Sequence, residues 1–370
     1  MTRPSGYIPT LDGWRAIAIT AVILLHAQAG ATGLTEWGGF GVDLFFAISG
    51  LLICSRLLEE ERLTGTLRLK DFYIRRVFRI LPGAYTFLLT CLVLEIAHIL
   101  PFDIPGILAS VFMVRNYYYW LGSGGRDAWY TAHFWSLSVE EHFYLLLPGL
   151  LFFVRKRRAF MLGSLALIFG GWRLFVEHSA VLHSKGLWLN TEMRIHSLLI
   201  PALGAVLAAR IAPRAWMVRW LTPWAALAVF LVAGLGAHQL RLHGLLWPVI
   251  IPVCFPLLVL STLLHPSTVA GRVLELAPLR YIGRISYSLY LWQMLFFRSG
   301  QSLAAAPLGY LQVFPWNCVA LSVCAFASYY LIEKPMIRIG HRLAPPATPG
   351  RELVEVQTTL PRIASPQVGI

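Results

Sequence analysis

One arginine and one histidine share a face of the first apolar segment, LDGWRAIAITAVILLHAQ. His26 follows Arg15 by 11 residues, which on a helix is a rotation of three turns plus about 20° and a rise of about 16 Å. Asp12 lies one turn before Arg15. An imidazole can exchange protons near neutral pH or accept an acyl group. The spacing therefore predicts a polar path with His26 as base or acyl carrier; the alternative is a histidine satisfied by a neighbouring helix.

Two carboxylates could hold the ring of His26 in place. Asp43 lies near the start of the second apolar segment, GGFGVDLFFAISG, and Glu140 lies in HFWSLSVEEHFYLLLP. A carboxylate that accepts a ring N–H orients the imidazole and selects its tautomer. Asp43 fits equally well as an exposed residue in the first turn of a helix. We expect His26, Asp43 and Glu140 to be the catalytic residues.

Polar side chains also share a face of two later segments. Spacings of three and four residues put His133, Ser136, Glu140 and Tyr144 on one helical face. The same spacing unites Ser286, Tyr290 and Gln293 in ISYSLYLWQ. We expect Tyr144 and Tyr290 to contact substrate. The alternative for such faces is a hydrogen-bonded contact between helices without chemistry.

The segment LRLKDFYIRRVFRILPGAY alternates basic and aromatic residues before Pro82. Arg75, Arg76 and Arg79 lie within about one and a half helical turns of each other. Guanidinium groups bind phosphates through paired N–H donors, so the segment predicts a site for a phosphate-bearing donor. Arg15, expected at the cytoplasmic boundary of the first segment, would guide the anionic arm of the donor or its entry. The alternative is a basic amphipathic helix on anionic lipid.

The elements that position these residues must lie in a membrane. The chain has 370 residues, of which 57% are apolar and 13% are charged, and its mean hydropathy is +0.64. These values exclude a soluble enzyme and a disordered chain. A spanning helix needs about 20 mostly apolar residues. We expect an all-α polytopic integral membrane bundle of about ten transmembrane helices, at 14–31, 39–56, 81–100, 134–154, 160–176, 194–210, 221–238, 245–264, 284–299 and 312–333.

Charge predicts the orientation of this bundle. If the segment 56–79 is cytoplasmic, 24 of the 31 Lys and Arg residues fall on that side, with both termini. The apolar run 107–121 is then expected in an outer loop or a re-entrant segment, because a further crossing would place the four basic residues 155–158 on the outer side of the membrane. Residues 1–340 form the predicted membrane domain, and the proline-rich stretch 341–370 reads as a disordered cytoplasmic tail. Near its start, Glu333 and Lys334 read as a helix-end ion pair. None of the five cysteines forms a C-x-x-C pair, so we expect no metal.

The order of these motifs resembles the acyltransferase-3 family of integral membrane acyltransferases. The resemblance rests on LDGWRAIAI followed by His26, GGFGVDLFFAISGLLI, RRVFRILPGAY, HFWSLSVEEHFYLLLP, RISYSLYLWQ and the final EKP, which together span about residues 7–340. It implies transfer of an acyl group, usually acetyl from cytoplasmic acetyl-CoA, to a hydroxyl of a carbohydrate or glycoconjugate. The family's Arg-x10-His pattern falls on Arg15 and His26, and its Arg-x2-Arg pattern falls on Arg76 and Arg79.

The same resemblance predicts a bacterial inner-membrane enzyme whose partners are the acyl-CoA donor, the carbohydrate acceptor and the lipid bilayer, without nucleic acid. Two positions depart from the family pattern, His196 after Arg194 and Gln293 after YLW. Aligned Arg and His residues would also suit a transporter of an anionic or glycan substrate, although the two halves of the chain show no symmetry of the kind many transporters have. A fold retained as an inactive assembly subunit is the third possibility.

Overall fold

The computed structural model describes residues 7–27, 34–118, 129–179, 187–210, 219–239, 243–297 and 308–346, and all regular structure in these ranges is helical. The longer helices are α1 (Pro9–Ala27), α2 (Leu34–Thr64), α3 (Leu69–Ile96), α6 (Phe134–Phe153), α7 (Arg158–His178), α10 (His196–Arg210), α12 (Pro223–Gln239), α13 (His243–Leu264), α16 (Ser286–Phe296), α17 (Trp316–Ala327) and α18 (Lys334–Leu343). The shorter elements are α4 (Ile104–Val111), α5 (Arg115–Tyr118), η1 (Trp129–Thr131), η2 (Leu187–Leu189), α9 (Thr191–Arg194), α14 (Val269–Leu274), α15 (Ala277–Arg284), η3 (Leu308–Gln312) and η4 (Ser328–Glu333).

The bundle has the lengths and polarity of a polytopic membrane protein. Six helical stretches of the described chain are long and apolar enough to cross a bilayer, namely Pro9–Ala27, Gly39–Thr64, Leu69–Ile96, Arg158–His178, Leu246–Leu264 and Trp316–Leu343. α10 and α12 contain shorter apolar stretches. Each of the ten predicted segments overlaps a helix, so the all-helical membrane architecture is confirmed, while the number of crossings stays a prediction. The run 107–121 contributes only the short helices α4 and α5, and residues 119–128 lie outside the described ranges.

Large apolar side chains cover the outside of this bundle. Phe153, Leu167 and Leu331 are 81%, 78% and 75% exposed. Water would penalise so much exposed apolar surface, whereas lipid chains solvate it, and the helical backbone leaves few polar groups unpaired. The exposed faces of these helices are therefore the lipid-facing surface.

Glycines bring the central helices close together. A Cβ atom on Gly41 of α2 would lie 2.5 Å from the Ala18 carbonyl oxygen of α1. One on Gly50 would lie 2.4 Å from the Leu198 carbonyl oxygen of α10. Only a residue without a side chain allows such approach, as expected for helix contacts in membranes. α2 is thereby packed between α1 and α10.

The last helix runs further than the sequence suggests. α17, η4 and α18 form one continuous helical stretch, Trp316–Leu343, and η4 is a π-helical turn. The predicted ion pair of Glu333 at a helix end is therefore wrong. Glu333 lies inside the stretch, is 3% exposed, and accepts hydrogen bonds from the hydroxyls of Ser288 and Ser328 at 2.7 and 2.8 Å. The π turn adds a residue to one helical turn and brings this carboxylate toward α16.

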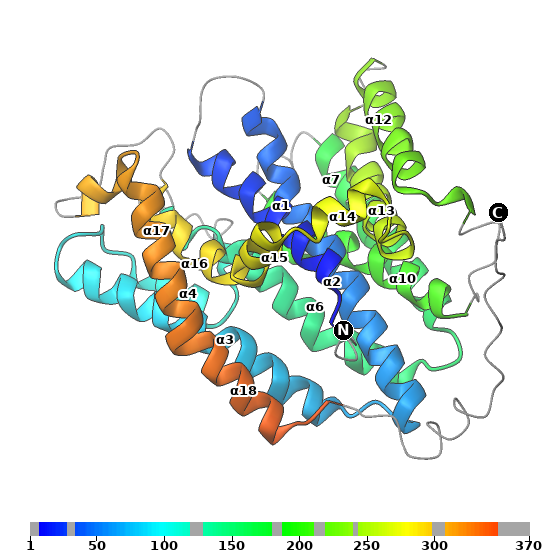
Figure 1. Cartoon of the computed structure of the whole chain (residues 1–370), viewed down its shortest axis with the longest axis horizontal. Helices are drawn as coiled ribbons and strands as arrows, with labels where there is room; N and C mark the ends of the chain where they lie inside the picture. The colour runs from blue at the N-terminus through cyan, green and yellow to red at the C-terminus, as the bar shows by residue number, and fades with distance from the viewer. Residues whose placement is uncertain are drawn as a thin grey trace, which may run out of the picture.

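α3 and α18 lie side by side on one flank of the molecule, and α7, α10, α12 and α13 gather on the other (Figure 1). α1, α2, α6 and α16 lie between these groups. The predicted tail is described only as far as residue 346. There the carbonyl oxygens of Ala344 and Pro345 accept hydrogen bonds from Arg75 and Arg68 at 3.4 and 3.1 Å.

Candidate functional site

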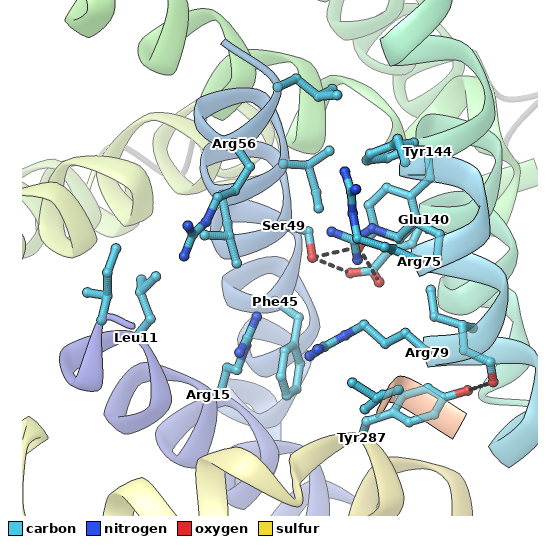
Figure 2. A pocket seen from close by; sticks show the side chains of 18 of the residues that line it. Leu11, Arg15, Phe45, Ser49, Arg56, Arg75, Arg79, Glu140, Tyr144 and Tyr287 are labelled. Carbon is cyan, nitrogen blue, oxygen red and sulfur yellow. Dashed lines mark hydrogen bonds between the residues drawn. The ribbon is translucent and has the colours of Figure 1, made fainter. Parts of the chain in front are cut away.

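A cavity of about 760 Å³ opens between α1, α2, α3, α6 and α16 (Figure 2). This volume is ordinary for the binding site of a small molecule or cofactor. Its mouth is formed by residues at one end of the bundle, including Tyr7, Glu59, Arg62, His341 and Pro346. That is the end at which the basic segment 56–79 lies, the side expected to face the cytoplasm.

Three arginines enter the cavity without a hydrogen-bonded carboxylate among the described residues. The side chains of Arg15 and Arg79 point toward one another from α1 and α3, with the ring of Phe45 beside them (Figure 2). Arg15 has only a loose ion pair, 3.7 Å from Asp12. The guanidinium carbon of Arg76 lies 4.7 Å from the centre of the Tyr144 ring, so this group is held by an aromatic face. Six arginines and five carboxylates line the cavity. Arg15, Arg76 and Arg79 stand out because they donate no hydrogen bond to any of these carboxylates.

Arg75, unlike Arg76 and Arg79, forms an ion pair with a carboxylate of the described chain. Its Nη2 atom lies 3.2 Å from the carboxylate of Glu60, which also pairs with Arg68 at 3.1 Å. Glu60 is 6% exposed, so this carboxylate joins the end of α2 to the start of α3. Arg75 lines the cavity, as predicted, but its charge is largely compensated.

Tyr7 at the mouth is held in its protonated form. Its hydroxyl donates to Asp12 at 2.7 Å, and the guanidinium carbon of Arg280 lies 5.8 Å from its ring centre. Burial, followed by the hydrogen bond to the Asp12 carboxylate, raises the pKa of the Tyr7 phenol. The hydroxyl thus remains a donor that fixes Asp12 beside Arg15.

Glu140 forms a polar wall with two hydroxyl groups (Figure 2). Ser49 donates to its carboxylate at 3.0 Å, and Tyr144 donates at 3.1 Å. Glu140 and Tyr144 thus line the cavity, as their shared helical face predicts. The carboxylate does not contact His26, so the predicted orienting contact is absent. Ser49, a single hydroxyl in the apolar run FFAISG, is a site residue that the sequence analysis missed.

The inner end of the cavity is marked by Tyr290 and Ser136. Their hydroxyl oxygens lie 2.5 Å apart, and Tyr290 also donates to the carbonyl oxygen of His133 at 3.0 Å. Both side chains line the cavity. The polar faces predicted on α6 and α16 are therefore turned toward each other here.

His26 lies beyond this inner end and does not line the cavity. Ile19 and Val22, both 0% exposed, occupy the helix between Arg15 and His26. The Nδ1 atom of His26 lies 2.9 Å from the Val22 carbonyl oxygen. Because a carbonyl can only accept, Nδ1 carries a proton and Nε2 is left for other partners. The backbone of α1 therefore selects the tautomer of His26, a role that we expected a carboxylate to fill.

Asp43 contacts an arginine instead of His26. Its carboxylate lies 3.8 Å from Arg194, whose guanidinium carbon lies 5.1 Å from the centre of the Trp135 ring. Arg194 precedes His196, which is buried with Nε2 placed 3.2 Å from the Pro248 carbonyl oxygen. Asp43 thus joins α2 to the turn before α10, and neither carboxylate that we expected to orient His26 does so.

No group of three or more His, Cys, Asp or Glu side chains suitable for a metal ion occurs in the described ranges. The guanidinium groups of the cavity can bind an anion of phosphate type, and apolar side chains and hydroxyl groups also line the cavity.

Comparison with known proteins shows the family of the chain. The protein-family model described as "Acyltransferase domain" matches residues 8–333. A Staphylococcus aureus (strain COL) protein named "Putative O-acetyltransferase SACOL0978" is 32% identical in an alignment of 320 residues, and the alignment covers 77% of this chain and 50% of the relative. The O-acetyltransferase OatA of Staphylococcus aureus (strain NCTC 8325 / PS 47) is 28% identical in an alignment of 370 residues with gaps, and the alignment covers 91% of this chain and 58% of OatA.

The chain spans about half the length of the curated relatives it matches. No solved structure matches it. The match to the family model covers most of the chain, including the helices that form the cavity and the segment that carries His26. The chain therefore belongs to the acyltransferase-3 family.

Proposed function

We propose that this protein is a membrane O-acetyltransferase that moves an acetyl group from acetyl-CoA to a hydroxyl of a carbohydrate or glycoconjugate. The observation that carries the proposal is the cavity with Arg15, Arg76 and Arg79, whose guanidinium groups have no carboxylate hydrogen bond among the described residues. The names of the relatives support the acetyl group and the oxygen acceptor.

In this proposal, the donor binds with its phosphates at the arginines. Guanidinium forks match phosphate oxygens, and the partly buried cavity strengthens the attraction. The thioester arm extends inward past Ser136 and Tyr290. Arg15 and His26 are 11 residues apart on α1, so the arm must reach about 16 Å to bring the acetyl group to the imidazole.

Transfer then takes place at Nε2 of His26. This atom removes the proton of the acceptor hydroxyl while the hydroxyl oxygen bonds to the acetyl carbon. The bond between that carbon and the thioester sulfur breaks, and the sulfur receives the proton from His26. In the alternative covalent route, Nε2 itself bonds to the acetyl carbon, the carbon–sulfur bond breaks and the thiolate of coenzyme A leaves. In a second step the acceptor oxygen bonds to that carbon, the carbon–nitrogen bond breaks and the freed Nε2 takes the proton of the acceptor hydroxyl.

The test uses purified full-length protein in lipid nanodiscs with acetyl-labelled acetyl-CoA and an oligosaccharide mixture. We expect His26→Ala to lower the rate of glycan labelling at least 100-fold, the scale of a lost general base. His178→Ala is the matched control, because His178 also ends a helix and places Nδ1 2.8 Å from the carbonyl oxygen four residues earlier, but is exposed on α7. Near-normal labelling by His26→Ala contradicts the role of His26, and a wild-type protein that labels no glycan contradicts the proposed activity.

Omission of the acceptor separates the two routes. Label that stays on wild-type protein but not on His26→Ala supports an acetyl-imidazole, whose Nε2 bond is labile to hydroxylamine. If the protein stays unlabelled without acceptor, and glycan is labelled at the full rate once acceptor is added, the result supports direct attack by the hydroxyl.

A further inference from the structure

Two buried polar side chains beyond the cavity have no hydrogen-bond partner within the described ranges. His133, just before α6, is 3% exposed, and neither of its ring nitrogens is paired. Gln293 of α16 is 0% exposed, and neither its amide oxygen nor its amide nitrogen is paired. A buried polar group without a partner destabilises the fold, and folded proteins contain few of them. Their presence together points to a partner that binds from outside the chain.

Both residues lie directly behind the inner end of the cavity. The rings of His133 and Tyr290 are 5.4 Å apart, and the Tyr290 hydroxyl donates to the backbone carbonyl of His133. Gln293 follows Tyr290 by three residues and so lies one turn further along α16. A group that enters past Tyr290 would reach these two side chains next.

They also lie close to His26. The His26 ring is the polar group nearest to a hydrogen bond with the Gln293 amide, but no atom of the amide meets hydrogen-bond geometry. His133 is close enough to His26 for the two rings to interact electrostatically. The Leu291 carbonyl lies near His133 but outside hydrogen-bonding geometry. His133 and Gln293 therefore lie close both to Tyr290, which lines the cavity, and to the imidazole of His26.

Aromatic rings keep this space dry. The centre of the His133 ring lies 5.4 Å from that of Phe87 and 5.0 Å from that of Phe134, both 0% exposed. In such surroundings, a fixed N–H donor stabilises a developing negative charge far more than it does in water.

We propose that His133 and Gln293 form the pocket for the carbonyl oxygen of the acyl group, an inference that rests on the proposed acetyltransferase function. The neutral ring of His133 offers one N–H and the Gln293 amide offers two. These donors bind the carbonyl oxygen, which gains negative charge when the hydroxyl oxygen or His26 Nε2 bonds to the acyl carbon. The charge leaves this oxygen when the carbon–sulfur bond breaks, and the sulfur takes the proton held by His26, or one from solvent in the covalent route.

The test replaces each donor by an apolar side chain of similar shape, in His133→Phe and Gln293→Leu. Because both groups lack a partner in the protein, their removal leaves the melting temperature unchanged or higher. We expect kcat to fall on the order of 100-fold in each variant, as for a lost donor to a transition-state oxygen, with KM for acetyl-CoA within about two-fold of wild type. Gln293→His, which restores an N–H donor, is expected to recover part of kcat.

Gln312→Leu is the matched control. Gln312 is 8% exposed and donates to the Leu295 carbonyl at 2.8 Å, near the same end of α16. Its replacement removes a satisfied hydrogen bond, so it should lower the melting temperature and leave kcat of the folded protein unchanged.

The outcomes separate this pocket from the proposed function. If wild type transfers acetyl, His26→Ala does not, and both donor variants keep wild-type kcat, the pocket is wrong and the function stands. A loss of kcat accompanied by a fall in melting temperature like that of Gln312→Leu makes the two residues structural and also overturns the pocket. A wild type without acetyl transfer overturns both proposals.

Discussion

At the scale of single residues, three arginines of the cavity donate no hydrogen bond to a carboxylate of the described chain. Arg15, Arg76 and Arg79 come from two helices, and the loose ion pair of Arg15 with Asp12 is the one carboxylate contact recorded for them in the described chain. Like charges repel strongly in partly buried surroundings, so an anionic ligand lowers the energy of this cluster. The arrangement is that of a binding site rather than of a contact that stabilises the fold.

Arg79→Gln is expected to raise KM for acetyl-CoA by about 10-fold to 100-fold, since a hydrogen bond to a charged group contributes about 1.5–3 kcal/mol. Arg76→Lys should also raise KM, because lysine loses both the paired donors and the flat contact with the Tyr144 ring. Steady-state kinetics at several donor concentrations measures the effect. Arg272→Gln, at an exposed residue of α14, is the control. Unchanged KM in both cavity variants contradicts phosphate binding at these arginines.

Asp43 permits a second residue-level prediction. Asp43→Asn should lower the melting temperature because it leaves the buried Arg194 charge without its carboxylate. The double variant Asp43→Asn with Arg194→Met removes both charges and should recover much of the stability and of the transfer activity. A stable double variant with no activity would instead support a direct role of Asp43 in catalysis.

At the scale of helices, the mouth of the cavity depends on a close crossing of α1 and α15. A Cβ on Gly283 would lie within bonding distance of the Asp12 carbonyl oxygen, and one on Gly13 would lie 2.3 Å from the Leu274 carbonyl oxygen. Backbone atoms cannot move aside as a flexible side chain can. The two glycines therefore set how closely α1 approaches the α14–α15 segment, and with it the position of Asp12 and Arg15.

Gly283→Ala is expected to separate α1 from α15 and to lower the melting temperature, with a rise in KM for acetyl-CoA because Arg15 moves. Gly171→Ala is the matched control, since a Cβ there meets no atom within 4 Å. Replacing a helical glycine at such an open position should be neutral or stabilising by up to about 1 kcal/mol. Thermal unfolding of both variants in the same detergent makes the comparison. Equal melting temperatures would show that the α1–α15 contact is not tight.

At the scale of the whole molecule, the proposed donor site requires a defined orientation in the membrane. The cavity mouth and the basic segment 56–79 share one end of the bundle, so from the positive-inside rule we expect both to face the cytoplasm. The opposite end of α3, around residues 97–103, should then face away from the cytoplasm.

Single cysteines test this orientation in a protein whose five native cysteines are replaced. A membrane-impermeant thiol reagent applied to intact cells should label Phe102→Cys, because Phe102 is 72% exposed beyond α3. It should label Thr66→Cys, an exposed residue between α2 and α3, only after the cells are opened. The reverse pattern would put the arginine cavity on the side that lacks acetyl-CoA and would contradict the proposed donor.

The sequence by itself determined which segments are helical and apolar, because hydrophobic length is a local property that lipid selects directly. Spacing along one helix defines a shared face, and seven residues predicted in this way line the cavity, while their roles stay predictions: Arg15, Arg75, Arg76, Arg79, Glu140, Tyr144 and Tyr290. Only the tertiary structure decided which faces oppose one another, because the rotation and depth of each helix depend on its packing partners. That is why Asp43 contacts Arg194, why Glu333 lies inside a helix, and why His26 lies behind Tyr290 rather than in the cavity.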